Sequence, residues 1–464
     1  MFSFPEAARY FGLKPLAPSP GETLCRGASI DTRSIRPGDC FFALSGQSVD
    51  GHQFLEKAFS LGASAAVVSQ HYVQSLGEGK ALPHGFKNVL CVEDPAAFLA
   101  DLASWHRSKF AIPFVGITGS VGKTSTKEFL RYLLQTQSPP ESVLATKGNL
   151  NNHLGLPLTL LELHEGHRFC VAEMGANAPG DIAFLCRILK PDAGIVTCVA
   201  PVHLEGMGSL QGIYKTKTDL FRALKPGAIA VTSAGDPEMD GILENIPVRV
   251  LKAGLQQDCE GSFSDVQVTG DWVSFLYRGQ KRFSFPGLAG FLALNASLAL
   301  LLAESLGVLP GKLPDRWEGF QLPDGRFTIK TLSGGIRVIY DGYNASPKSF
   351  EKALETLTMI PCEGKRIVVF SDMRELGDAS ADFHRALGLS IDRSGLDAAY
   401  AFGQESRAAI EAMSQISDAR HFDGPDDLSA YLGGRLEKGD MLLLKASRGM
   451  KIERVLERLE KNPG

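Results

Sequence analysis

The sequence predicts an α/β protein of three domains, in which a central domain built on a parallel sheet lies between two smaller α/β domains. Three observations predict this fold. A chain of 464 residues is too long for a single hydrophobic core. Short apolar runs, such as residues 169–172 and 194–199, alternate with helical stretches, which is typical of parallel strands joined by right-handed crossovers. Residues 114–134 read as a strand, a glycine-rich bend and a helix.

The first domain is expected over residues 1–108. Between residues 23 and 70, short apolar runs such as 40–44 alternate with turns at Pro37-Gly38 and Asp50-Gly51. This alternation predicts a small α/β unit.

The central domain is expected over residues 109–320. Pro113 introduces its first strand, which ends near Ile117, and the helix after the bend carries four apolar residues on one face, Phe129, Leu130, Leu133 and Leu134. The uncharged segment 283–303 contains a proline and breaks of glycine and serine, so it predicts a buried helix beginning after Gly290 rather than a membrane span.

The third domain is expected over residues 321–464, where the alternation of strands and helices restarts. Its strands are expected at residues 366–370, 399–402 and 441–444, with a helix near 382–391. This pattern predicts a second, Rossmann-like α/β unit.

The composition favours small-molecule partners. Hydrophobic residues make up 44% of the chain and charged residues 22%, and the formal net charge of −4 lacks the basic excess of a nucleic-acid binder. The eight cysteines are scattered without metal spacing, which predicts reduced thiols and no structural metal. Glu6 and Arg9 precede any apolar stretch long enough for a signal peptide, so a cytoplasmic location is expected.

Residues 116–126 have the features of a phosphate-binding loop. Gly119 and Gly122 allow backbone N–H groups to turn toward phosphate oxygens, Lys123 supplies a positive charge, and the Thr124 hydroxyl suits Mg²⁺. The usual pattern has glycine where this chain has Ile117, so the first glycine of the loop is Gly116 or Gly119. The loop predicts ATP binding, with contacts from Gly119, Ser120, Val121, Gly122, Lys123, Thr124 and Ser125. A glycine-rich turn with a surface lysine is the alternative, and the loop alone does not separate a kinase from an ATPase or a ligase.

Polar residues follow the predicted strands at the edge where ligands of parallel sheets gather. Glu173 follows the strand 169–172, so its carboxylate and the Thr124 hydroxyl could face one Mg²⁺. His203 follows the strand 194–199. A helix near 214–221 carries Lys215 and Lys217, which by default face solvent.

Four motifs occur in a fixed order: Thr-Gly-Ser-Val-Gly-Lys-Thr-Ser at 118–125, Glu-Met-Gly-Ala-Asn at 173–177, His-Leu-Glu-Gly-Met-Gly-Ser at 203–209 and Asp-Gly-Tyr-Asn-Ala-Ser-Pro at 341–347. On these motifs the chain resembles, nearly end to end, the Mur ligases of peptidoglycan synthesis. Residues 148–161, 372–377 with His384, and 444–450 make it most similar to the branch that joins D-alanyl-D-alanine to UDP-N-acetylmuramoyl-tripeptide. The Asp-Asn-Pro-Arg motif of the diaminopimelate-adding relatives is absent.

The resemblance implies an ATP-dependent ligase that forms an acyl phosphate and yields the pentapeptide precursor used in cell wall biogenesis. A monomer is expected, although the sequence leaves the oligomeric state open. It implies that Glu173 and His203 bind Mg²⁺, with two ions in all, and that Lys217 reacts with CO₂ to form a carbamate, with Lys215 as the competing candidate. Catalysis is then expected to depend on Lys123, His203 and Lys217. A lysine kept neutral by neighbouring positive charge can add CO₂, and the resulting anion is a hard oxygen ligand.

The same resemblance places Asn295 near the adenine, Arg326 on the phosphates and Asp341 near the ribose. The alternatives are a helix cap or buried amide for Asn295 and a surface ion pair between Arg326 and Asp341. Relatives usually carry His-Asn where this chain has Phe291-Leu292. The expected substrate contacts are Thr32 and Arg33 for the diphosphate and Ser447 and Arg448 for the dipeptide. Five further substrate contacts are expected: Asn149, Asn151, Asn152, Tyr343 and Asn344.

Three rival functions remain open from the sequence. A folylpolyglutamate synthetase shares the phosphate loop and the carbamate chemistry. A nucleotide-binding regulator would hydrolyse ATP without joining two substrates, and a phosphate-loop kinase would release a lasting phosphorylated product.

Overall fold

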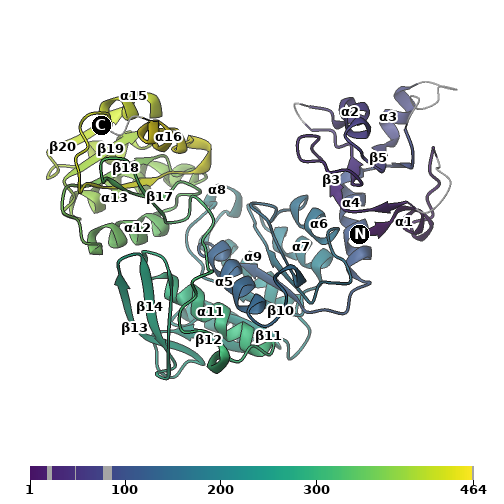
Figure 1. Cartoon of the computed structure of the whole chain (residues 1–464), viewed down its shortest axis with the longest axis horizontal. Coiled ribbons are helices and arrows are strands. Elements are labelled where there is room, and N and C mark those ends of the chain that lie inside the picture. Colours follow the sequence, from purple (N-terminus) through teal and green to yellow (C-terminus); the bar gives the residue numbers. More distant parts are fainter. Residues whose placement is uncertain (18–22, 47–48, 77–85, 462–464) are drawn as a thin grey trace.

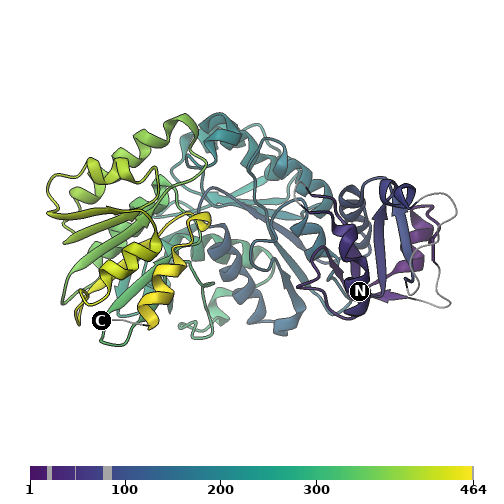
Figure 2. The same cartoon turned by 90° about the horizontal axis from the view of Figure 1, so that it is seen from above.

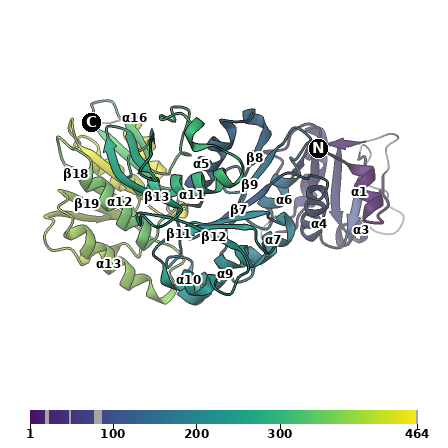
Figure 3. The same ribbon diagram turned by 90° about the horizontal axis from the view of Figure 1, so that it is seen from below.

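The computed structural model describes residues 1–17, 23–46, 49–76 and 86–461. The chain forms an open V, with the central part at its base and the N-terminal and C-terminal parts as its two arms (Figure 1). The views from above and below show the same order along the long axis (Figures 2 and 3). The α/β fold class expected from the sequence is confirmed in all three parts.

The N-terminal part combines two small sheets. The strands β1 (Phe2–Ser3) and β2 (Leu24–Cys25) pair antiparallel, and β3 (Ala28–Ser29), β4 (Cys40–Phe42), β5 (Ala65–Ser69) and β6 (Val89–Val92) form a parallel sheet. The helices are α1 (Phe4–Tyr10), α2 (Leu55–Ser60), α3 (Gln70–Ser75) and α4 (Pro95–Arg107). Asp94 caps α4 by accepting hydrogen bonds from two backbone N–H groups, which is the usual way such helices begin.

The central part contains a nine-stranded sheet in the order β15-β14-β13-β12-β11-β10-β7-β9-β8. Its strands are β7 (Phe114–Thr118), β8 (Val143–Ala145), β9 (Phe169–Glu173), β10 (Ala193–Val196), β11 (Ile229–Ser233), β12 (Arg249–Gly254), β13 (Gly261–Thr269), β14 (Trp272–Tyr277) and β15 (Lys281–Pro286). Its helices are α5 (Lys123–Gln135), α6 (Gly155–Leu160), α7 (Asp181–Leu189), α8 (Leu204–Met207), α9 (Leu210–Arg222), α10 (Pro237–Leu243) and α11 (Leu292–Ser305).

Two sequence predictions for this sheet need correction. The sheet is mixed rather than purely parallel, because β13, β14 and β15 pair antiparallel through tight turns at Gly270 and Gly279, both with positive φ. The strand expected over 194–199 ends at Val196, because Thr197 turns its hydroxyl onto the carbonyl oxygen of Val121 in the phosphate loop, at 2.6 Å.

The helix expected after Gly290 is α11, which is buried almost throughout and packs against α5 and the sheet. None of the helices in the described part of the chain has the length and apolarity needed to cross a membrane. The four apolar residues predicted on one face of α5 are all buried in the same core.

The C-terminal part has a six-stranded sheet in the order β16-β17-β21-β18-β19-β20, parallel except for β16. Its strands are β16 (Thr328–Thr331), β17 (Arg337–Asp341), β18 (Arg366–Ser371), β19 (Ala398–Phe402), β20 (Asp418–Phe422) and β21 (Met441–Lys445). Its helices are α12 (Pro347–Met359), α13 (Ser380–Asp392), α14 (Arg407–Glu411), α15 (Pro425–Leu432) and α16 (Glu453–Lys461). Val368 packs in the core with α12 and α13, whereas Val369 packs in the core with α15 and α16, so both faces of the sheet are covered.

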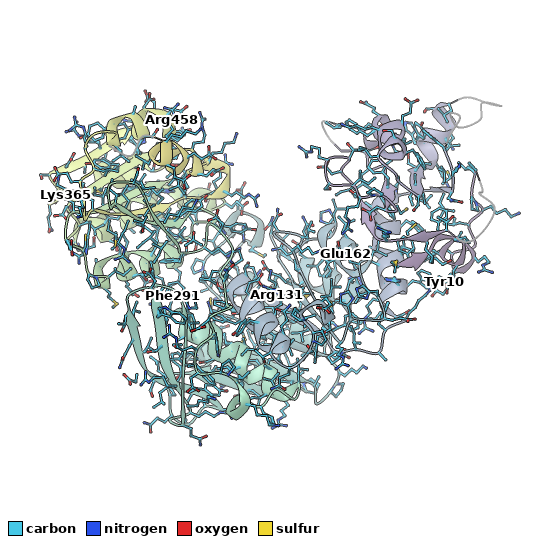
Figure 4. The ribbon with its side chains drawn as sticks, viewed as in Figure 1. Tyr10, Arg131, Glu162, Phe291, Lys365 and Arg458 are labelled. Carbon is cyan, nitrogen blue, oxygen red and sulfur yellow. The ribbon has the colours of Figure 1, made fainter. Side chains whose placement is uncertain are left out.

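Polar contacts join the parts. Arg36 of the N-terminal arm pairs with Glu162 at 3.1 Å, and Lys147 pairs with the other oxygen of the same carboxylate at 2.7 Å. Glu162 lies on the side of the central part that faces this arm (Figure 4). On the other side, Arg337 pairs with Asp271 at 3.2 Å.

Candidate active site

The phosphate loop runs from the end of β7 to the start of α5. Gly119 has φ +142° and Gly122 has φ +89°, conformations that residues with a side chain rarely adopt. A Cβ at Gly119 would overlap the Thr197 hydroxyl, and one at Gly122 would lie 2.7 Å from Asn295 Oδ1. Glycine is therefore required at both positions by conformation and by close neighbours.

The adjacent segment after β10 supports the loop. Ser120 donates its backbone N–H to the carbonyl oxygen of Cys198 at 2.8 Å, and its hydroxyl bonds to the backbone of Ala200 at 2.9 Å. Together with Thr197, these contacts hold the loop open for a ligand before any ligand binds.

Lys123 begins α5 and folds back over the loop. Its ammonium group donates to the carbonyl oxygens of Gly119 at 2.8 Å and Ser120 at 3.2 Å. Burial lowers the pKa of Lys123, an effect that the Glu173 carboxylate opposes and Arg326 reinforces. The side chain is therefore a partly buried amine in position to bind an anion.

A carboxylate and a hydroxyl meet at the base of the loop. Thr124 Oγ1 donates to Glu173 Oε2 at 2.7 Å, and Asn151 Nδ2 donates to Glu173 Oε1 at 2.8 Å. Both Thr124 and Glu173 are buried. Glu173 is the last residue of β9 rather than the residue after it, and its carboxylate stays within reach of the loop.

His203 precedes α8 with a left-handed backbone, φ +51°. Its Nδ1 contacts the carboxylate of Glu375, which belongs to the C-terminal part and also has a positive φ of +67°. The hydrogen bond with His203 lowers the pKa of Glu375.

Lys217 lies in α9 with only 1% of its surface exposed, whereas Lys215 is exposed. Burial, reinforced by the charge of Lys123, lowers the pKa of Lys217 from 10.5 to about 7. Among the residues that the structure describes, none forms a hydrogen bond or ion pair with Lys217 Nζ. This lysine is a buried amine of low basicity, unlike the solvent-facing residue that its position in a helix suggests by default.

A cavity of about 780 Å³ opens between the central and C-terminal parts. Sixteen of the residues predicted for the site line it: Ser120, Val121, Gly122, Lys123, Ser125, Asn149, Asn151, Asn152, Glu173, His203, Asn295, Arg326, Asp341, Tyr343, Asn344 and Arg448. Asn295 lies inside α11, four residues after its N-cap, and is a buried amide facing Gly122.

A second cavity of about 1200 Å³ adjoins the first, since Arg326, Tyr343 and Arg448 line both. Thr124 lines it from the central part, and Arg36 lines it from the N-terminal arm. Side chains from all three parts of the chain therefore line these two neighbouring cavities.

Arg326 and Asp341 do not form the surface ion pair considered as an alternative. Asp341 is buried and pairs with Lys445 at the end of β21, whose ammonium group also donates to the carbonyl oxygen of Asn344 at 3.1 Å. The Arg326 guanidinium instead stacks over the ring of Tyr343, 3.9 Å from its centroid.

Five predicted site residues line neither cavity: Gly119, Lys217, Thr32, Arg33 and Ser447. Thr32 and Arg33 lie in the N-terminal arm beyond β3, where Arg33 is exposed and pairs with Asp31 at 2.6 Å. Ser447 is buried, and its hydroxyl accepts the backbone N–H of Arg374 at 3.0 Å, so in this conformation it supports a loop.

Four further residues complete the site but were not singled out in the sequence. Thr197 supports the phosphate loop, Lys445 pairs with Asp341, Glu375 contacts His203, and Asp181 attracts the charge of Lys217. Lys445 and Glu375 fall inside quoted motifs. Nothing in the sequence singles out Thr197, because its role depends on two strands that lie side by side only in the fold.

Three family descriptions match the chain: "Mur ligase family, catalytic domain" over residues 25–107, "Mur ligase middle domain" over 117–303 and "Mur ligase, glutamate ligase domain" over 325–448. The UDP-N-acetylmuramoyl-tripeptide--D-alanyl-D-alanine ligase of Bacillus subtilis (strain 168) is 31% identical, with 95% of this chain and 94% of that protein covered.

Solved structures agree with these matches. MurF ligase from Thermotoga maritima in complex with ADP has 32% identity and a TM-score of 0.78, with 95% of this chain and 98% of that chain covered. MurF from Acinetobacter baumannii has 26% identity and a TM-score of 0.83, with 96% and 95% covered. The phosphate loop, the buried lysine and the three-part fold thus occur in a chain that belongs to the Mur ligase family.

Proposed function

We propose that this protein is an ATP-dependent ligase that joins D-alanyl-D-alanine to UDP-N-acetylmuramoyl-tripeptide through an acyl phosphate. The observation that carries the proposal is the gathering of Lys123, Glu173 and His203 around one cavity that the C-terminal part also lines. The similarity to a ligase named for these substrates covers nearly the whole length of both chains, which supports the same substrates here. The product is the pentapeptide precursor of peptidoglycan.

The donor set suits Mg²⁺. Thr124 and Glu173 bring two hard oxygen donors together at 2.7 Å, at the positive end of α5. Across the described residues, no group of three or more His, Cys, Asp or Glu side chains could hold a metal by itself. This fits an ion that takes part of its ligands from substrate phosphates.

Thr124, Glu173, His203 and Lys217 are the residues that we propose hold two Mg²⁺ ions. The bound ions would neutralise the negative charge that develops on the transferred phosphoryl group. The complex of the Thermotoga maritima relative with ADP supports nucleotide binding by this chain. We propose that the nucleotide lies at the phosphate loop, with Asn295 at the adenine, Arg326 at the phosphates and Asp341 at the ribose.

We propose that Lys217 becomes a carbamate. CO₂ adds only to a neutral amine, and a pKa of about 7 leaves a large neutral fraction at neutral pH. The new C–N bond forms as the amine loses one proton, and the buried lysine becomes an anion. That anion would compensate the charge of Lys123, which lowers the pKa of Lys217.

In the proposed reaction, an oxygen of the tripeptide's terminal carboxylate attacks the γ-phosphorus of ATP and ADP leaves. Lys123, which is bonded here to the carbonyl oxygens of its own loop, would turn its donors to the phosphates. The amino group of the dipeptide then attacks the acyl carbon, loses a proton and displaces phosphate. Closing the C-terminal part over the cavity would exclude water, which otherwise hydrolyses the acyl phosphate.

The remaining proposed substrate contacts come from all three parts of the chain. We propose domains over residues 1–108, 109–320 and 321–464, with Thr32 and Arg33 binding the diphosphate in the first. The acceptor would be contacted by Asn149, Asn151, Asn152, Tyr343 and Asn344. The dipeptide would be positioned by Arg448, and by Ser447 through the loop that Ser447 supports. We further propose that the protein acts as a monomer in the cytoplasm.

The test is an end-point assay with purified protein, ATP, Mg²⁺, UDP-N-acetylmuramoyl-tripeptide and a panel of dipeptides. We expect a new amide product by mass spectrometry and one phosphate released per product, with D-alanyl-D-alanine preferred. Stimulation by a pteroyl substrate alone would favour the folylpolyglutamate rival. ATP hydrolysis without an amide would favour a regulator, and a phosphorylated product that persists with amine present would favour a kinase.

A further inference from the structure

The central and C-terminal parts meet at an imidazole and a carboxylate. His203 precedes α8 in the central part, and Glu375 follows β18 in the C-terminal part. His203 Nδ1 contacts Glu375 Oε2 directly, and both residues line the 780 Å³ cavity beside Lys123 and Glu173. The imidazole that we assign to the metal site is thus held by a side chain from another domain.

The contact fixes the tautomer of the imidazole. A glutamate carboxylate is ionised at neutral pH, and an ionised carboxylate only accepts hydrogen bonds. Nδ1 must therefore carry the proton, which leaves the lone pair of a neutral ring on Nε2. Within the described ranges, no protein group hydrogen-bonds to Nε2.

The loop that carries Glu375 is built to hold this position. His384 Nε2 accepts the backbone N–H of Met373 at 3.0 Å, and the Ser447 hydroxyl accepts that of Arg374 at 3.0 Å. Gly377, two residues after Glu375, packs against the backbone of Glu205 in α8. The approach of Glu375 to His203 therefore rests on several independent contacts.

We propose that Glu375 is a positioning residue of the metal site: by accepting the Nδ1–H of His203, it orients Nε2 as the ligand for a divalent cation. Histidines that bind metals usually donate their other ring N–H to such a carboxylate, and loss of the partner lowers metal affinity about 10–100-fold. The inference rests on the metal role proposed for His203.

Because the carboxylate comes from the C-terminal part, docking of that part and metal affinity are coupled. Any increase in metal affinity on docking must be matched by an equal increase in docking affinity when the metal binds. Metal binding would therefore favour the arrangement in which the dipeptide-binding part covers the site.

The experiment measures Mn²⁺ affinity of the full-length protein by electron paramagnetic resonance, in the presence of a non-hydrolysable ATP analogue. We expect Glu375→Ala to weaken Mn²⁺ binding about tenfold or more, Glu375→Gln to weaken it less, and Glu375→Asp to recover most of it. The matched control is Asp271→Asn, which breaks the other ion pair between these two parts, with Arg337, outside the cavity. It keeps the contact of Glu375 with His203, so it should weaken Mn²⁺ binding much less than Glu375→Ala does.

A second readout excludes a purely structural effect. Nitrogen-15 chemical shifts of His203 should show the Nδ1–H tautomer in the wild type and a mixture of tautomers in Glu375→Gln. Circular dichroism verifies that each variant is folded, and Glu375→Gln replaces Glu375→Ala in the affinity measurement if the latter does not fold.

The outcomes separate this inference from the proposed function. If His203→Ala weakens Mn²⁺ binding and the Glu375 variants do not, the positioning role is wrong and the proposed function stands. If Glu375→Ala tightens binding, the carboxylate competes with the metal and the inference is overturned. If His203→Ala has no effect, the metal role of His203 itself is wrong.

Discussion

Lys217 should make the stability of the central domain increase with pH. Burial and Lys123 lower the pKa of Lys217 to about 7 in the folded protein, whereas an exposed lysine in the unfolded chain titrates near 10.5. Between these values the unfolded chain binds more protons than the folded protein. The free energy of unfolding therefore rises with pH across this window, and the gain is absent below about pH 7, where both states are protonated.

The size of the effect follows from the two pKa values. One unit of pH corresponds to about 1.4 kcal/mol when one state holds a proton that the other has lost. From pH 7 to pH 9 the folded lysine goes from half protonated to nearly neutral, while the unfolded lysine stays charged. Integration over this range gives an increase of about 2 kcal/mol for the wild type, which Lys217→Met should lack.

The assay is urea unfolding at pH 7 and pH 9 in buffers free of CO₂. Trp317 is fully buried among Phe129, Phe283 and Phe285, so its fluorescence reports unfolding of the central domain. The measurement uses a background in which Trp105 and Trp272 are phenylalanine. Lys215→Met is the matched control, because that lysine is exposed two residues earlier in the same helix. If the free energy of unfolding rises equally in the wild type and in Lys217→Met between pH 7 and pH 9, titration of Lys217 is not the cause of the rise.

Three further predictions concern the loop and the C-terminal domain. Gly119→Ala should lower nucleotide affinity about tenfold in calorimetry, since φ +142° and the Thr197 hydroxyl leave no room for a methyl group; unchanged affinity would contradict the loop geometry. Lys123→Ala should reduce ATP turnover about 10²–10³-fold and leave UDP binding intact. Normal ATP turnover in this variant would contradict the proposed contact of Lys123 with the phosphates. Asp341→Asn should destabilise the C-terminal domain by about 3–5 kcal/mol in thermal unfolding, because it leaves the buried ammonium of Lys445 unpaired. Unchanged stability would mean that water solvates this ammonium group.

The local elements of the site could be predicted from the sequence. The phosphate loop is encoded within a short stretch, because a buried strand, two glycines with positive φ and a lysine at the helix start each leave a local signal. The four apolar residues of α5 likewise appear at helical spacing, and all are buried.

The contacts between distant segments could not be predicted. The partner of Asp341 is Lys445, over a hundred residues away, and it faces Asp341 because β17 and β21 are neighbours in register. The burial of Lys217 depends on packing around α9, so its helical position alone suggested a solvent-facing lysine.

The mixed central sheet was missed for a different reason. β13 alternates buried and exposed residues only in part, and β14 and β15 have half-buried rather than exposed residues between their buried ones. The uncharged stretch after residue 282 also hides the boundary between β15 and α11. Propensity alone does not separate a short apolar strand from the start of a buried helix.

The proposed acyl phosphate reaction requires the transfer of an oxygen atom from the acceptor's carboxylate to phosphate. The decisive measurement supplies UDP-N-acetylmuramoyl-tripeptide labelled with oxygen-18 in its terminal carboxylate, together with ATP and D-alanyl-D-alanine. An acyl phosphate route predicts one labelled oxygen in each inorganic phosphate released with product. Amide product accompanied by unlabelled phosphate would contradict it.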